Sequence, residues 1–222
     1  MTATLYYIHD PMCSWCWGFR LTWDELQNHL PRDLEIQYVL GGLAPDTHQP
    51  MPMALRQTIQ QHWYRINDLL GTEFNFDFWS FNTPKRSTYP ACRAIIAAKV
   101  IAKKYNLNLD VGKIMVDAIQ RGYYLRAMNP SENDILETLF QEVATELSLP
   151  VEAASDFRTV LDSDETHEVL NGQIKLARNL SDAGFPSLVL EWGDQLYPIG
   201  IDYRDWQSMQ FSISNIINTV RP

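Results

Sequence analysis

The stretch Asp10-Pro11-Met12-Cys13-Ser14-Trp15-Cys16-Trp17-Gly18-Phe19 holds two of the three cysteines of the chain. It follows the apolar run Leu5-Tyr6-Tyr7-Ile8, which is typical of a short buried strand, and it leads into residues with helical spacing. Two thiols three positions apart at the start of a helix lie on one face, within about one turn. Cys13 and Cys16 can therefore close a small disulfide or attack another disulfide in turn.

The first part of the chain predicts a strand, a helix and a second strand. The first strand covers Thr4 to His9, and the helix runs from Cys13 until Pro31 ends it. Residues 34–43 alternate between apolar and polar side chains and close with Gly41-Gly42, which predicts the second strand. Such a βαβ unit has parallel strands and a right-handed crossover.

The middle of the chain, from Ala54 to about Ser181, predicts a helical block. Apolar residues recur there at helical spacing, for example at Leu55, Ile59, Trp63, Ile66 and Leu70. Three helix starts have candidate capping side chains, namely Asp110, then Ser131 or Asn133, then Ser163.

A run of aromatic residues lies between two of these predicted helices, at Phe74, Phe76, Phe78, Trp79 and Phe81. We interpret it as a loop buried under the helical block, because burial of large rings offsets the entropy cost of ordering a loop. The alternative interpretation is an aromatic groove for a ligand.

The end of the chain predicts a hairpin and a last helix. The hairpin joins residues 187–191 and 195–199 through a turn at residues 192–194, and Asp202 can cap the final helix. Each end alone has too few strands to bury a sheet face. We therefore predict an α/β fold in which one sheet domain, residues 1–50 plus 175–222, is interrupted by a helical insertion domain, residues 51–174.

Composition narrows the class of function. The chain has 222 residues and a formal net charge of −9, with scattered basic residues, which argues against nucleic acid or an anionic membrane as partner. No apolar run is long enough to span a bilayer, and the N-terminus has no basic region or cleavage site, so we expect a cytoplasmic protein. In a reducing compartment, a CxxC motif is more often a catalytic or metal-binding site than a structural disulfide.

Zinc binding by this motif requires two further ligands. The chain has no second cysteine pair, and His48, His62 and His167 are dispersed, so we predict no metal site. Cys92 follows the helix-opening Pro90 and is interpreted as a small buried apolar residue. The alternative is a third reactive thiol with a pKa lowered by Arg93.

The order of these parts resembles the thioredoxin-fold proteins of the DsbA type, over essentially the whole chain. The motif from Asp10 to Gly18, with Pro90-Ala91-Cys92-Arg93-Ala94 and Gly184-Phe185-Pro186-Ser187-Leu188-Val189, is most similar to the signal-less, FrnE-related branch. The resemblance implies that Pro186 is cis and that its loop lies against the sulfur of Cys13. Kappa-class glutathione transferases and 2-hydroxychromene-2-carboxylate isomerases belong to the same superfamily and have serine at the nucleophile position, whereas this chain keeps both thiols.

The positions of the two thiols predict different roles. Cys13 lies where unpaired N–H groups and the helix dipole lower a thiol pKa, so it is the expected nucleophile, and the more buried Cys16 is the resolving thiol. Trp15, Phe185 and Pro186 are the expected substrate contacts, with Phe185 offering a backbone edge to an extended segment.

Neither residue between the cysteines is cationic, which predicts a reduction potential between strongly oxidising and strongly reducing. Thioredoxins keep a buried acid six residues before the nucleophile, and this chain has Tyr7 there, which leaves the general base unassigned. His9 is the nearest alternative by sequence, although a histidine at a strand end is more often structural.

The predicted function is a thiol–disulfide oxidoreductase or isomerase acting on protein or small-thiol disulfides. It needs no bound cofactor, and glutathione is a candidate redox partner. Two alternatives remain: a glutathione-dependent transferase or isomerase, and a chaperone-like or binding protein with an inert CxxC.

Overall fold

The computed structural model of the chain describes residues 3–193 and 195–220. In the described part, the strands form one four-stranded sheet in the order β2-β1-β3-β4. The strands are β1 (Thr4–His9), β2 (Glu35–Leu40), β3 (Ser187–Trp192) and β4 (Gln195–Ile199). β1 runs parallel to β2 and antiparallel to β3, and β4 runs antiparallel to β3. Both ends of the chain thus build one mixed sheet; Asp194, in the predicted hairpin turn, lies outside the described residues.

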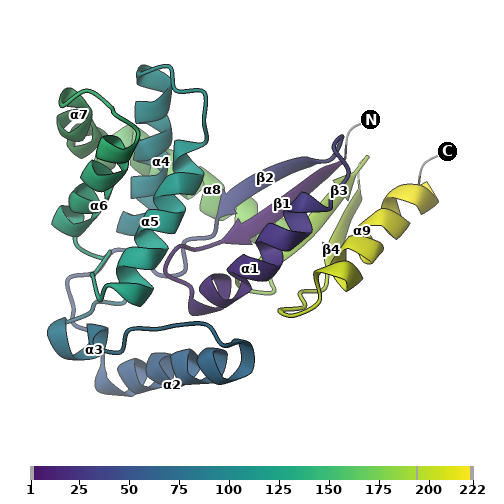
Figure 1. The fold of residues 1–222 in the computed structure, drawn as a ribbon, viewed down its shortest axis with the longest axis horizontal. Helices are drawn as coiled ribbons and strands as arrows, with labels where there is room; N and C mark the ends of the chain where they lie inside the picture. Colours follow the sequence, from purple (N-terminus) through teal and green to yellow (C-terminus); the bar gives the residue numbers. More distant parts are fainter. Residues whose placement is uncertain (1–2, 194, 221–222) are drawn as a thin grey trace.

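The helices separate into those around the sheet and those of a block beside it (Figure 1). They are α1 (Ser14–Asn28), α2 (Met53–Leu70), α3 (Phe78–Phe81), α4 (Tyr89–Lys104), α5 (Val111–Leu125), α6 (Asn133–Glu146), α7 (Glu152–Leu161), α8 (Asp164–Leu180) and α9 (Trp206–Val220). Among the described residues, no helix combines the length and the apolar character needed to cross a bilayer. This is the predicted α/β fold: a thioredoxin fold interrupted between β2 and β3 by helices.

The sheet domain and the helical block each have their own apolar core. α1 and α9 cover one face of the sheet, where Phe19, Trp23 and Ile213 are almost fully buried. α8 contacts the other face, with Ala177 packed on Ile8 and other apolar residues of the strands. The block has a separate core around Trp63 and other large side chains. α8 is continuous across the predicted domain boundary at residues 174 and 175.

Two of the predicted helix caps are confirmed. The carboxylate of Asp110 accepts a hydrogen bond from the backbone N–H of Lys113 at 3.1 Å, at the start of α5. The hydroxyl of Ser163 accepts one from the backbone N–H of Thr166 at 3.3 Å, at the start of α8. Both side chains satisfy a backbone donor that the helix itself leaves unpaired.

The other two predicted caps are wrong. Glu132 is the N-cap of α6, while the Ser131 hydroxyl donates to a backbone carbonyl elsewhere. At the start of α9, Asp205 rather than Asp202 accepts hydrogen bonds from two backbone N–H groups of the helix. Asp202 instead accepts from backbone N–H groups in the preceding turn. Both predictions chose a polar residue close to the helix start. The backbone turn before each helix decides which side chain reaches the first N–H groups, and the sequence does not show that turn.

The predicted burial of the aromatic run is confirmed in its centre. Phe78 and Trp79 form the short helix α3 and are buried, and Trp63 of α2 packs against both. Phe81 is 76% exposed, so the prediction is wrong for this residue. Burial of the central rings fixes the segment between α2 and α4 against the helical block. Packing alone therefore explains these aromatic residues, and the alternative of a ligand groove is not required.

Candidate active site

Cys13 is the N-cap of α1, with an extended backbone of φ −82° and ψ 115°. Its backbone N–H donates to the Asp10 carbonyl at 3.0 Å, and its own carbonyl accepts from Trp17 at 3.1 Å, so a turn places the thiol at the first turn of the helix. Cys13 and Cys16 lie 3.6 Å apart and are both free thiols. Cys13 is 7% exposed and Cys16 only 1%. The two sulfurs are therefore near enough to exchange, and the first is the more accessible.

The two thiols have pKa values shifted in opposite directions. A hydrogen bond from the Cys16 thiol lowers the pKa of Cys13, assisted by backbone N–H groups of Cys16 and Trp15 and opposed by burial and by the charge of Asp10. Burial raises the pKa of Cys16 well above its ordinary value, and the neighbouring Cys13 raises it further. The pKa values of the two thiols thus differ in the predicted direction, and Cys13 is the thiol of the pair that ionises first.

The loop before β3 lies directly against Cys13. The peptide bond between Phe185 and Pro186 is cis, and the Cys13 thiol donates to the Phe185 carbonyl at 3.4 Å. The Phe185 ring packs with Ile8 and its apolar neighbours on the α8 side of the sheet. A Cβ at Gly41 would lie 2.1 Å from this ring. The structure thus brings together the predicted residues Cys13, Phe185 and Pro186. Gly41 is a further residue next to this loop, and its only signal in the sequence was the glycine pair that ends a strand.

Asp10 opens the motif, and the sequence did not indicate its burial or its partners. It is fully buried, and its carboxylate accepts hydrogen bonds from the backbone N–H groups of Met12 at 2.8 Å and Leu43 at 2.7 Å. It also accepts from the Thr88 hydroxyl at 2.6 Å. Burial raises the pKa of Asp10, and these hydrogen bonds oppose the shift. Asp10 thus connects the segment that holds both thiols to the loop after β2 and to the residue that precedes α4.

Cys92 lies on the buried side of the same carboxylate. Its thiol is fully buried and contacts Asp10 at 3.7 Å. Burial and the charge of Asp10 raise the pKa of Cys92 well above the ordinary value. Arg93 is engaged elsewhere, in a bidentate pair with Asp46 at 2.8 and 3.1 Å. These contacts favour the interpretation of Cys92 as a buried structural thiol over a third reactive one.

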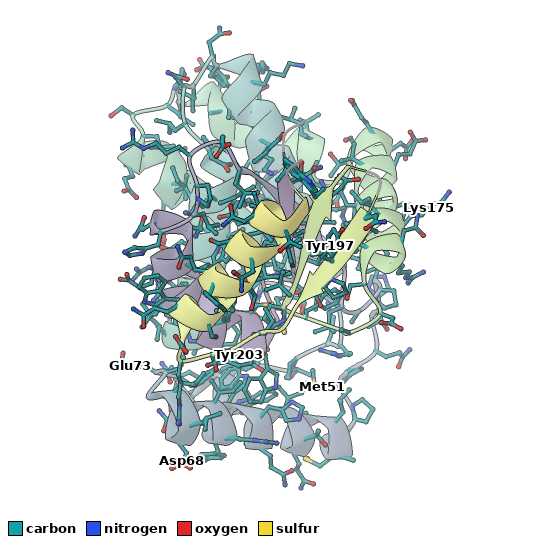
Figure 2. All side chains as sticks on the ribbon, turned by 90° about the vertical axis from the view of Figure 1, so that its right-hand side faces the viewer. Met51, Asp68, Glu73, Lys175, Tyr197 and Tyr203 are labelled. Carbon is teal, nitrogen blue, oxygen red and sulfur yellow. The ribbon has the colours of Figure 1, made fainter. Side chains whose placement is uncertain are left out.

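Trp15 is half-buried at the edge of the site. Its ring lies 5.1 Å from that of Tyr203, and the guanidinium of Arg65 lies 5.8 Å from its centroid. Figure 2 shows Tyr203 on the segment leading into α9, close to α2. Arg204 donates to the Leu69 carbonyl at the end of α2, which holds this segment there. Trp15 is thus bordered by both parts of the molecule.

Tyr7 and His9 lie behind the motif rather than at Cys13. Burial raises the pKa of Tyr7 well above its ordinary value, so this phenol is not ionised at neutral pH. Burial, followed by the charge of Lys99, lowers the pKa of His9 to about 3. The two rings stack with centroids 5.1 Å apart. His9 is therefore a neutral, packed imidazole.

Within the described part of the chain, no group of three or more histidine, cysteine or acidic side chains could hold a metal ion. The dispersed histidines are not brought together with the cysteine pair.

Comparison with known proteins supports the architecture. The family model described as thioredoxin matches residues 6–211. A candidate protein disulfide isomerase from Nitrosomonas europaea has a similar structure, with a TM-score of 0.79, 27% identity and all of both chains covered. The cytosolic disulfide reductase DsbM from Pseudomonas aeruginosa has a TM-score of 0.71 and 24% identity, with 97% of each chain covered.

A 2-hydroxychromene-2-carboxylate isomerase shares the fold at 13% identity, with a TM-score of 0.57 and coverage of 98% of this chain and 95% of the other. No curated protein matches the sequence. The family model spans the CxxC motif, the helical block and the Phe185-Pro186 loop together. The chain belongs to the thioredoxin family and has the DsbA-like form of its fold.

Proposed function

We propose that the protein is a thiol–disulfide oxidoreductase or isomerase in which Cys13 is the nucleophile and Cys16 the resolving thiol. The observation that carries this proposal is the position of Cys13 as the N-cap of α1, beside Cys16 and facing the Phe185 carbonyl. The opposite pKa shifts of the two thiols support the same division of roles.

The reaction requires no group beyond the two thiols. The Cys13 thiolate attacks one sulfur of a substrate disulfide, forms a mixed disulfide and expels the other sulfur as a thiolate, which takes up a proton. Cys16 then loses its proton and attacks Cys13, which closes the protein disulfide and releases the second substrate thiol. Two electrons pass from protein to substrate, and two molecules of a small thiol such as glutathione return them and become a disulfide. The reverse sequence oxidises a substrate dithiol.

Substrate recognition is proposed for the surface next to Cys13. Phe185 presents backbone beside the sulfur, which suits an extended peptide or the peptide-like backbone of glutathione. Trp15 offers a half-buried ring at the edge of the site. A structure of DsbM has been solved with glutathione, which supports glutathione as a candidate partner here. Because DsbM is a cytosolic reductase, we also propose a reducing cytoplasmic setting for this chain.

The experiment compares the wild type with Cys13→Ser and Cys16→Ser in insulin reduction and in dithiol oxidation. The expected result is loss of both activities in Cys13→Ser. Cys16→Ser should accumulate a mixed disulfide, detectable by mass spectrometry, because no resolving thiol remains. Full activity in Cys13→Ser would show that another group is the nucleophile.

The same variants separate the alternatives. Glutathione-dependent turnover of an electrophile that survives in Cys13→Ser would indicate a transferase or isomerase. Absence of turnover in every form, with retained binding of unfolded polypeptide, would indicate a chaperone-like protein. The oxidoreductase proposal excludes both results.

A further inference from the structure

A cavity of about 570 Å³ lies between the sheet domain and the helical block. Its sheet side is formed by Tyr7 and His9 of β1, Tyr38 of β2 and Trp23 of α1, and α4 and α5 form the opposite wall. Cys16 also borders it, whereas Cys13 and Phe185 do not. The cavity therefore meets the proposed thiol-exchange site only at Cys16. Its volume is in the range of small-molecule sites.

Two buried polar side chains face this cavity with unused hydrogen-bonding capacity. His9 is 3% exposed and Gln120 4%, and neither side chain forms a hydrogen bond with any other residue that the structure describes. The neutral imidazole has one donor and one acceptor, and the amide has two donors and an acceptor. Buried polar groups in folded proteins are almost always paired, so these two are expected to find partners inside the cavity.

The walls between these polar groups are aromatic. The rings of Tyr7 and Trp23 stack with centroids 4.4 Å apart, and Tyr38 meets both edge-on, at 5.7 and 6.1 Å. His9 and Trp23 both stack on the Tyr7 ring, so a ligand meets this cluster at ring edges, and edge-to-face contacts favour an aromatic ligand over an aliphatic one.

Lys99 is a cation available to this cavity. It lines the wall and forms no ion pair or hydrogen bond within the described ranges, 3–193 and 195–220. Its side chain lies against α5 at Gly112, where a Cβ would lie 2.2 Å from its Cε. Its charge also acts on His9. An anionic group on a ligand would give Lys99 a partner.

The other charged groups that line the cavity are Arg20, Asp24, Asp110, Lys113, Asp117 and Glu146. Most of them have partners: Asp110 caps α5, Asp117 pairs with both Arg20 and Arg121, and Asp24 and Lys113 contact Gln27. Glu146, at the end of α6, forms no ion pair within the described part of the chain, so its charge repels an anion close to it, and Lys99 is the lining group that would attract one.

We propose that this cavity is a binding site for a planar aromatic molecule carrying one anionic group. Its ring lies among Tyr7, Trp23 and Tyr38, its polar ring atoms bond to His9 and Gln120, and its anionic group meets Lys99. The site does not depend on thiol exchange at Cys13.

The test is isothermal titration calorimetry on the full reduced chain with indole-3-acetate, neutral indole and cationic tryptamine. We expect saturable binding of indole-3-acetate at one site, weaker binding of indole, and the weakest binding of tryptamine. Lys99→Gln should weaken indole-3-acetate binding roughly fivefold without changing indole binding. Gln120→Leu, which keeps the side-chain volume, should weaken both roughly tenfold.

Two substitutions to tryptophan, one inside the cavity and one outside it, test whether the ligand binds in the cavity. Val116→Trp places an indole in the cavity and should abolish binding, whereas Val100→Trp, at a position of α4 that is 40% exposed and outside the lining, should leave it unchanged. Circular dichroism checks that each variant is folded, and the two milder variants decide the result if Val116→Trp is not. No saturable binding of any probe, or binding that none of the cavity variants weakens, would overturn the proposal and indicate a cavity filled by water. Tryptamine binding as tightly as indole-3-acetate would overturn the anion assignment.

Discussion

At the scale of single residues, the thiolate character of Cys13 depends on its neighbour in the motif. The hydrogen bond from Cys16 is the largest cause of the lowered Cys13 pKa, ahead of the opposing burial. A serine at position 16 keeps a hydroxyl donor near the sulfur, and an alanine has none.

We therefore predict a higher Cys13 pKa in Cys16→Ala than in Cys16→Ser. The measurement is the ultraviolet absorbance of the thiolate as a function of pH, with the iodoacetamide reaction rate as a second readout. Both variants lack the resolving thiol, so any difference in their Cys13 pKa values comes from the hydrogen-bond donor at position 16. Equal pKa values would mean that the backbone N–H groups of the helix start, rather than Cys16, hold the thiolate.

His9 predicts a pH dependence of stability. Its pKa is lowered to about 3 in the folded chain, against 6.5 for an unperturbed histidine. Between these values the unfolded chain binds a proton that the folded chain does not, so stability falls as pH falls through this window, by up to about 1.4 kcal/mol per pH unit. Above pH 6.5 His9 is neutral in both the folded and the unfolded chain, so it adds no pH dependence to the stability there.

His9→Phe keeps a ring stacked on Tyr7 and removes the titration. We expect the free energy of unfolding, measured with urea at several pH values, to decline less steeply with acidification in His9→Phe than in the wild type. Subtracting the two curves cancels the carboxylates they share. Parallel curves from pH 6.5 to 4 would mean that His9 accepts a proton in the folded state.

At the scale of elements, the end of β2 positions the loop that precedes β3. Gly41 follows β2, its N–H donates to the His9 carbonyl at 2.8 Å, and the Phe185 ring occupies the space a Cβ would need. Gly172, inside α8, has open space around the corresponding position.

Gly41→Ala should displace the Phe185 ring, move the carbonyl that faces Cys13, and lower insulin-reduction activity at least severalfold while the fold is kept. The matched control Gly172→Ala should retain activity and gain about 0.5–1 kcal/mol of stability, because alanine is the better helix former. Activities that fall equally in both variants, or in neither, would show that the ring is not what Gly41 accommodates.

The same elements show which structural features can be predicted from sequence. Hydrophobic periodicity, prolines and glycines are local signals, and they located β1, α1, β2 and the helices of the block other than α3, which was predicted as a loop. Asp110 and Ser163 were found as caps because a cap acts within three residues. The number of strands at each end predicted that both ends share one sheet. It did not specify the pairing of β3 with β1, because nothing local specifies contacts between positions so distant in sequence.

The environment of Asp10 could not be predicted, because it depends on tertiary contacts. Its partners Leu43 and Thr88 lie 33 and 78 positions away, and neither residue type signals a carboxylate partner. The caps of α6 and α9 failed for a related reason, since a shift of one to three residues in the preceding turn decides which side chain reaches the helix. The proximity of Cys13 and Cys16 was predictable, because residues three positions apart at the start of a helix lie on one face.

At the scale of the whole molecule, the core of the sheet and the core of the helical block meet at the segment that holds Cys13 and Cys16. Trp17 of α1 packs with the helical block, stacking on Tyr124 at 5.4 Å, while Phe19 packs in the sheet core. Asp10 joins the same two parts through Thr88. The helical block is thus part of the surroundings that set the properties of Cys13, as well as one wall of the cavity behind Cys16.

This arrangement predicts an intermediate reduction potential. Cys16 and backbone N–H groups stabilise the Cys13 thiolate, but the buried Asp10 opposes it and neither Ser14 nor Trp15 adds a cation. We expect a midpoint between about −270 and −120 mV, the values of thioredoxin and DsbA. Equilibration with glutathione buffers, read by mass spectrometry after alkylation, measures it, and a value outside this window would contradict the argument.

Asp10→Asn tests the cause of that potential. Removing the negative charge should lower the pKa of Cys13 and stabilise the reduced form, so the potential should become more positive by about 30 mV for each unit of pKa change. Thr88→Val is the matched control: it removes a hydrogen bond to the same carboxylate and keeps the charge, so it should reduce stability by about 1–3 kcal/mol with a smaller change in potential. If Thr88→Val shifts the potential as far as Asp10→Asn does, packing at the junction of the two cores sets the thiolate stability, and the charge of Asp10 does not.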